Sequence, residues 1–133
     1  MIECPQHLLY SVSHTWVDIV DENACRARVG ITLYLQEELP EILSVDLPME
    51  GDELEIDNPC MHLHLAGDTI TEVCSPLTGR VVAINHDVLD NPDLLHVAPY
   101  DHWIFEMEFD EKPELELLIE ASRYVTHCET LSE

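Results

Sequence analysis

The chain has 133 residues, enough for one domain with a hydrophobic core of its own, and 46% of them are hydrophobic. Its 28 acidic residues against five Lys and Arg give a formal net charge of −23. Charge of that sign repels phosphate backbones and anionic lipid head groups, so the composition disfavours binding to nucleic acid or to a membrane surface. It suits a protein that meets basic partner surfaces, although a well-solvated surface with no partner is the simpler explanation.

Alternating apolar and polar residues predict short strands through the first half of the chain. The segments 14–20 and 24–31 form a predicted hairpin. The apolar spacing of 31–42 suits one or two helical turns, closed by Pro40. A further strand is expected at 43–48.

The second half continues this pattern and ends in a helix. Two short strands within 60–74 fold back on each other at 66–69, and another strand is expected at 79–88. In 101–111 every second residue is apolar, which is typical of a sheet with one buried face. From Pro113 the period changes to that of an amphipathic helix. Many short strands with a terminal helix predict a mainly β fold, a compact antiparallel sandwich or barrel.

The beginning of the chain and its cysteines predict a cytoplasmic protein. Residues 1–16 have neither a basic start nor an apolar run of signal length, and no later segment approaches a membrane span. The cysteines are odd in number, widely spaced and without a Cys-x-x-Cys pair, which is typical of reduced thiols. They are Cys4, Cys25, Cys60, Cys74 and Cys128. We therefore expect a single domain, residues 1–133, in the cytoplasm.

Three stretches of the chain carry a family likeness. Tyr10–Val17 contains Tyr followed by His-x-Trp-Val, and 29–54 contains Gly-Ile-Thr, Gln-Glu-x-Leu and Val-x-Leu-Pro-x-x-Gly. The stretch 74–109 contains Ser-Pro-x-x-Gly-x-Val-x-x-x-Asn, Asn-Pro-x-Leu and Pro-Tyr. Over about Tyr10–Leu131 the sequence resembles the H protein of the glycine cleavage system, the lipoyl carrier that shuttles an aminomethyl group between the other proteins of that system.

This resemblance implies a fold and a set of partners. The fold is the lipoyl-type hammerhead, in which two antiparallel sheets pack as a flattened barrel or sandwich, with a short early helix and a C-terminal helix. The implied partners are proteins, among them the glycine cleavage enzymes.

The likeness fails at the residue that would carry the lipoyl group. The family places a lysine at the tip of the 60–74 hairpin, and counting from the two flanking motifs puts that position at Gly67 or at Asp68. Lipoate is held through an amide, which needs an exposed primary amine on a long stem, and neither residue supplies one. The only lysine in the chain is Lys112, outside any predicted hairpin. We therefore predict that no lipoate is attached.

A second departure lies in the opening motif. The family commonly has Glu between the His and the Trp, in the cleft where the loaded arm rests, and here that position is Thr15. Gly67-Asp68 is in addition a favoured two-residue hairpin turn. Both observations favour a hairpin that carries no cargo.

Alternation places a row of possible metal ligands on one face of the hairpin. Cys60, His62 and His64 share that face, and residues two apart on a strand lie about 7 Å apart, near enough for two imidazoles to bind one metal ion. With a two-residue turn, Thr71 would lie opposite His64 and Val73 opposite His62, and neither is a strong ligand. A further ligand would have to come from elsewhere, such as His14, His86, His96 or His102. The alternative is a solvent-facing polar row, with Cys60 as a half-buried small hydrophobe.

The remaining motifs predict no enzyme. There is no Ser-His-Asp order, phosphate-binding loop or zinc-protease helix motif, and Cys74 has Glu72 rather than a basic residue beside it. The leading hypothesis is a non-lipoylated binding, adaptor or regulatory protein that docks to glycine cleavage components. The alternative is a metal- or thiol-binding redox or sensor protein that uses the His/Cys-rich hairpin on a carrier-derived fold.

Overall fold

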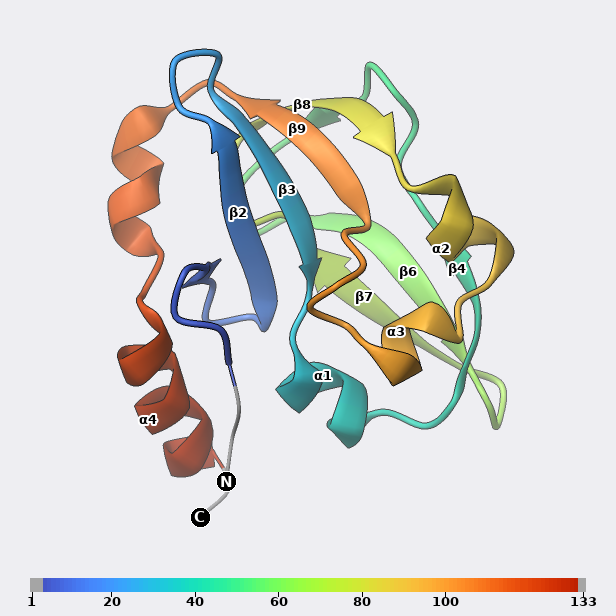
Figure 1. Ribbon diagram of the computed structural model, residues 1–133. Helices are drawn as coiled ribbons and strands as arrows, with labels where there is room; N and C mark the ends of the chain where they lie inside the picture. The colour runs from blue at the N-terminus through green and yellow to red at the C-terminus, as the bar shows by residue number, and fades with distance from the viewer. Residues whose placement is uncertain (1–3, 132–133) are drawn as a thin grey trace.

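The computed structural model describes residues 4–131 and shows two antiparallel sheets that pack against each other (Figure 1). One sheet has six strands in the order β1-β2-β3-β9-β8-β5, and the other has three in the order β4-β6-β7. The sheets do not close into a barrel, so the sandwich is the architecture observed. The mainly β prediction is confirmed.

Most elements lie where the sequence predicts them. The strands are β1 (Leu9–Tyr10), β2 (Thr15–Asp21), β3 (Arg26–Ile31), β4 (Ile42–Asp46), β5 (Glu53–Leu54), β6 (Pro59–Leu65), β7 (Thr69–Cys74), β8 (Gly79–Ile84) and β9 (Phe105–Phe109). The helices are α1 (Leu33–Glu38), α2 (His86–Asp90), α3 (Leu94–Val97), the 3-10 helix η1 (Lys112–Leu117) and α4 (Ala121–Leu131).

The main core lies between the two sheets and follows from the period of two along the strands. In β6 and β9 every second residue is buried, and these residues are Met61, Leu63, Leu65, Phe105, Met107 and Phe109. The residues between them are only half-buried, because they point away from the core. Each large apolar side chain buried in this way contributes about 1.5–3 kcal/mol, so the alternation specifies which face of each strand turns inward.

A second apolar cluster holds α4 against the N-terminal strands. Tyr10 stacks on Tyr124 with ring centroids 4.7 Å apart, and both side chains are fully buried. Ala121 and Cys128, which lie on the same face of α4, are also buried. Figure 1 shows α4 at the lower left of the molecule, below β1.

The predicted C-terminal helix is interrupted. The sequence predicts one helix from Pro113, whereas the structure has η1, an extended break and then α4. In the break, Ile119 exchanges two backbone hydrogen bonds of 2.8 Å with Tyr10, so these residues form a β-bridge instead of a helical turn. The neighbouring Leu118 turns into the main core. Tertiary pairing therefore overrides the helical period here.

The predicted strand at 79–88 is also shorter than expected. β8 ends at Ile84, and the side chain of Asn85 accepts a hydrogen bond from the Asp87 N–H and so caps α2. Asn is a favoured N-cap residue because its side-chain oxygen satisfies a free backbone N–H of the first helical turn. His86 is therefore helical rather than part of a strand.

Candidate functional site at the β6–β7 turn

The β6–β7 turn is the place where the family would present its lysine. Leu65 pairs with Thr69, so Ala66, Gly67 and Asp68 form a turn of three residues. Gly67 and Asp68 both have positive φ, 89° and 61°, and both are exposed. Such backbone angles favour Gly and Asp over most residue types, which explains why the sequence has these two residues here.

This turn does not fit a lipoyl group. Asp68 has a carboxylate on a one-carbon stem and Gly67 has no side chain, so neither forms the amide that lipoate requires. Lys112 is the first residue of η1. Figure 1 shows η1, in orange-red between β9 and α4, on the side of the molecule opposite the β6–β7 turn. The only primary amine on a side chain is therefore remote from the turn.

Thr15 is not at a surface cleft. Its side chain is fully buried, and its hydroxyl lies 2.7 Å from the Ser11 hydroxyl. The Thr15 N–H also donates to Ser11 Oγ at 3.1 Å. Thr15 therefore takes part in a local polar contact that fixes the start of β2, and it offers no group to a ligand.

The register of the hairpin differs by one residue from the prediction. Ile70 lies opposite His64 and Glu72 lies opposite His62, whereas the sequence analysis placed Thr71 and Val73 there. The physical reason is the length of the turn, because a third turn residue shifts every cross-strand pair by one. The predicted faces of β6 are nonetheless confirmed, with His62 and His64 on the outer side.

The polar side chains on the outer side of β6 make their contacts with other residues of the chain. His64 Nε2 lies 2.6 Å from Asp46 Oδ2, and His62 Nε2 lies 3.8 Å from Glu72 Oε2. The Cys60 thiol donates to the Val73 carbonyl, and burial raises the Cys60 pKa to about 12. Between residues 4 and 131, no group of three or more His, Cys, Asp or Glu is arranged to hold a metal ion. The metal site at Cys60, His62 and His64 stays a prediction that the geometry does not favour.

The other candidate residues also serve the fold. His14 Nδ1 lies 2.8 Å from the Tyr124 hydroxyl, and His96 Nε2 accepts from the Ile42 N–H at 2.9 Å. Burial, with Asp57 and Glu72 as further causes, raises the pKa of Cys74, which disfavours the reactive thiolate. His14 and His96 therefore use a ring nitrogen in contacts that hold the fold together.

A shallow groove lies beside the turn, with two exposed aliphatic side chains at its edges. The groove has a volume of about 330 Å³ and lies between β4, β7 and the turn. Leu43 and Ile70, from the two strands that flank β6, are each 57% exposed. Asp68 at the turn also lines the groove. The sequence analysis missed this feature, although an isoleucine on the polar face of β7 could have indicated it.

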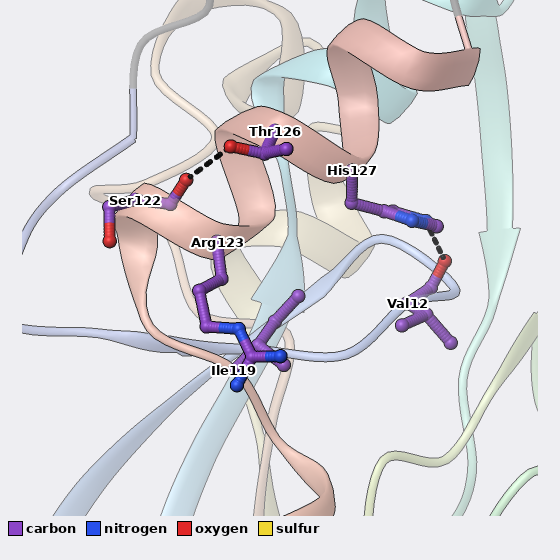
Figure 2. Close-up of a pocket in the computed structure, with 6 residues that line it drawn as sticks. All are labelled: Val12, Ile119, Ser122, Arg123, Thr126 and His127. Atoms are coloured by element: carbon purple, nitrogen blue, oxygen red, sulfur yellow. Dashed lines mark hydrogen bonds between the residues drawn. The ribbon is translucent and has the colours of Figure 1, made fainter.

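A second groove, of about 490 Å³, runs along α4 (Figure 2). Figure 2 shows the Arg123 side chain lying next to Ile119, and His127 pointing to Val12. His127 Nε2 donates to the Val12 carbonyl at 3.3 Å, and Thr126 Oγ1 donates to the Ser122 carbonyl at 3.2 Å. The His127 bond fastens α4 to the loop before β2, whereas the Thr126 bond lies within α4. The arrangement has no nucleophile with an adjacent base.

No helix within residues 4–131 is long and apolar enough to cross a membrane. The two packed sheets, the exposed hairpin turn and the C-terminal helix define a lipoyl-type hammerhead domain. The profile of the "Glycine cleavage H-protein" family matches residues 8–131. The chain belongs to the glycine cleavage H-protein family.

Individual relatives agree with this assignment. The chain is 39% identical over 121 residues to the glycine cleavage system H protein of Oceanobacillus iheyensis, covering 90% of this chain and 93% of the relative. It is 36% identical to that of Bacillus subtilis, with coverage of 90% and 92%. The crystal structure of the H protein from Mycobacterium marinum superposes with a TM-score of 0.77 at 26% identity and covers 92% of this chain and 97% of that one. The predicted family and fold are confirmed, and membership in a family of carriers agrees with a protein that is not an enzyme.

Proposed function

We propose that this chain is an H-protein homologue that carries no lipoate and acts in the cytoplasm as a binding, adaptor or regulatory protein for glycine cleavage enzymes. The observation that carries the proposal is a contrast within one molecule. The family profile matches 8–131, yet the exposed turn at Gly67 and Asp68 has no amine. Docking depends on the surface of the fold, whereas cargo depends on one lysine, so the first can persist without the second.

The absence of cargo is tested by intact-mass measurement after co-expression with lipoate-attaching enzymes. We expect the unmodified mass, because an amide bond needs a nucleophilic amine at the turn. The H protein of Bacillus subtilis, expressed in the same cells, is the positive control. A lipoyl adduct on the native chain would overturn the proposal.

A matched pair of variants tests whether the amine alone is missing. Asp68→Lys and Gly67→Lys each place an amine in the exposed turn, one in each of the two possible registers. A new Cβ at Gly67 would meet no atom within 4 Å, and Asp68 is exposed, so packing blocks neither variant. The positive φ of Gly67 still strains any side chain placed there, so Asp68→Lys is the less perturbing of the two. We expect an adduct on the variant whose register agrees with the family.

Docking is tested by retention of purified glycine cleavage components on the immobilised chain. The decarboxylase and the aminomethyltransferase are applied separately, with the Bacillus subtilis H protein as the reference. We expect at least one of them to be retained. Retention of neither would remove the glycine cleavage system as the place where this chain acts.

A further inference from the structure

The two sheets differ in how their acidic residues are balanced. On the outer side of the six-stranded sheet, Arg28 lies 3.2 Å from Glu106, and Arg80 contacts Glu53, Glu108 and Asp110. On the β4-β6-β7 sheet no such compensation exists, because residues 29–79 contain neither Lys nor Arg. Its acidic residues meet at most a histidine among the described residues. The negative charge of this face is therefore left for a partner to neutralise.

The same face has the two exposed aliphatic side chains. Leu43, Ile70 and Asp68 line the groove next to the turn. Asp46 and Glu72 lie on either side of His62, one cross-strand row further from the turn than Ile70 on the same face. The name tip patch is used below for Leu43, Asp46, Asp68, Ile70 and Glu72. Exposed apolar side chains surrounded by polar ones are typical of an interaction site, since burial of the apolar groups supplies affinity while the charges supply orientation.

We propose that the tip patch binds a protein segment in which an aromatic or aliphatic side chain is flanked by lysines or arginines. This inference rests on the proposed function and specifies the chemistry of the partner. The apolar side chain would enter the groove of about 330 Å³ between Leu43 and Ile70. The flanking cations would lie next to Asp68 and Glu72.

The charge of the chain selects this occupant over two others. A second copy of the chain would bring a net charge of −23 against the same acidic surface, which is repulsive. An anionic lipid surface is repelled for the same reason. A basic segment is attracted, and the attraction also accelerates its association at low salt.

The test uses short synthetic peptides, so that it does not depend on which partner is the natural one. The peptide acetyl-Lys-Lys-Phe-Lys-Lys-amide is titrated into the full chain and binding is followed by NMR at low and at physiological salt. Two matched peptides replace the Phe by Ser or every Lys by Glu. We expect the first peptide to bind, with shifts at the tip patch that weaken with salt. Equal binding of the Glu peptide or of the Ser peptide would overturn the inference.

Variants of the chain place the site. Leu43→Ser and Ile70→Ser should each lower the affinity for the Phe-containing lysine peptide by about five- to tenfold, because each removes apolar surface that the Phe side chain buries. Val97→Ser on α3 is the matched control, since Val97 is a 79% exposed aliphatic residue outside the tip patch, and it should leave binding unchanged. Asp68→Asn should weaken binding and reduce its salt dependence. Equal effects of the patch and control variants would refute the assignment.

The outcomes separate this inference from the proposed function. If the peptides fail to bind while a glycine cleavage enzyme is retained, the tip patch is wrong and the adaptor role stands. If the native chain acquires a lipoyl adduct while the tip-patch variants still bind the peptide more weakly, the proposed adaptor role is wrong. The inference that the tip patch binds a basic segment is then still supported.

Discussion

Tyr124→Phe should destabilise the protein through a single oxygen atom. The Tyr124 hydroxyl lies 2.8 Å from His14 Nδ1 and 2.7 Å from Thr32 Oγ1. It therefore joins α4 to the turn before β2 and to the residue that caps α1. Burial raises the Tyr124 pKa well above its usual range, so the hydroxyl stays protonated at any pH where the protein is studied. The ring stacks on Tyr10, and phenylalanine would keep that contact.

The loss of stability in Tyr124→Phe depends on which group loses its hydrogen-bond partner. Without the hydroxyl, His14 Nδ1 loses its hydrogen-bond partner and has no other among residues 4–131, in a half-buried site. Thr32 Oγ1, in contrast, still accepts from the Leu35 N–H at 3.2 Å. Leaving one such group unsatisfied costs about 1–3 kcal/mol. We therefore expect the free energy of unfolding to fall by roughly 2 kcal/mol, with almost no contribution from lost apolar packing.

Equilibrium urea unfolding, followed by circular dichroism, measures this difference. Tyr34→Phe is the matched control, because the Tyr34 ring also lies against His14, tilted and with ring centroids 4.8 Å apart. Its hydroxyl makes no hydrogen bond with any residue from 4 to 131. The control should change stability by less than about 0.5 kcal/mol. If Tyr124→Phe were as stable as the wild type, or if both variants lost the same amount, the hydrogen-bonded hydroxyl would not be what fastens α4.

Three further changes test other parts of the fold. Gly79→Ala should lower the free energy of unfolding by more than about 3 kcal/mol, because its Cβ would collide with the Glu108 carbonyl in β9. Gly51→Ala has open space around it but a positive φ, so in the same urea assay it should lower the free energy of unfolding by only about 1 kcal/mol. Burial raises the pKa of Cys60 to about 12, so near neutral pH Cys60 should react with iodoacetamide far more slowly in the folded chain than in the urea-unfolded chain. Peptide mass mapping measures the two rates, and equal rates would contradict this prediction. Burial is the main cause that lowers the pKa of His14, so folding favours the neutral form of its ring. The contribution of neutral His14 to the free energy of unfolding is complete above the pKa of the unfolded chain, about 6.5. It is lost as the pH falls through the lower pKa of the folded protein. Urea midpoints across this range should therefore decline less for His14→Asn than for the wild type, and parallel declines would show that other groups cause the effect.

The sequence by itself determined the features that depend on local chemistry. A period of two along β6 and β9 assigned the buried face correctly, because side chains on a strand alternate irrespective of which strand lies beside it. The absence of an amine at Gly67 and Asp68 is likewise readable without coordinates. Ordered motifs along the chain were sufficient for the family, which the profile match over 8–131 confirms.

Only the tertiary structure decided how the elements meet. The hairpin register depends on whether the turn has two or three residues, and the sequence Ala66-Gly67-Asp68 is compatible with both. The helical period from Pro113 was interrupted because Ile119 pairs with Tyr10, a residue more than a hundred positions away. Leu43 and Ile70 come to line one groove because β4 and β7 lie on either side of β6. Local patterns specify which side of a strand is apolar, but the contacts between distant segments compete with those patterns and are settled only when the chain packs.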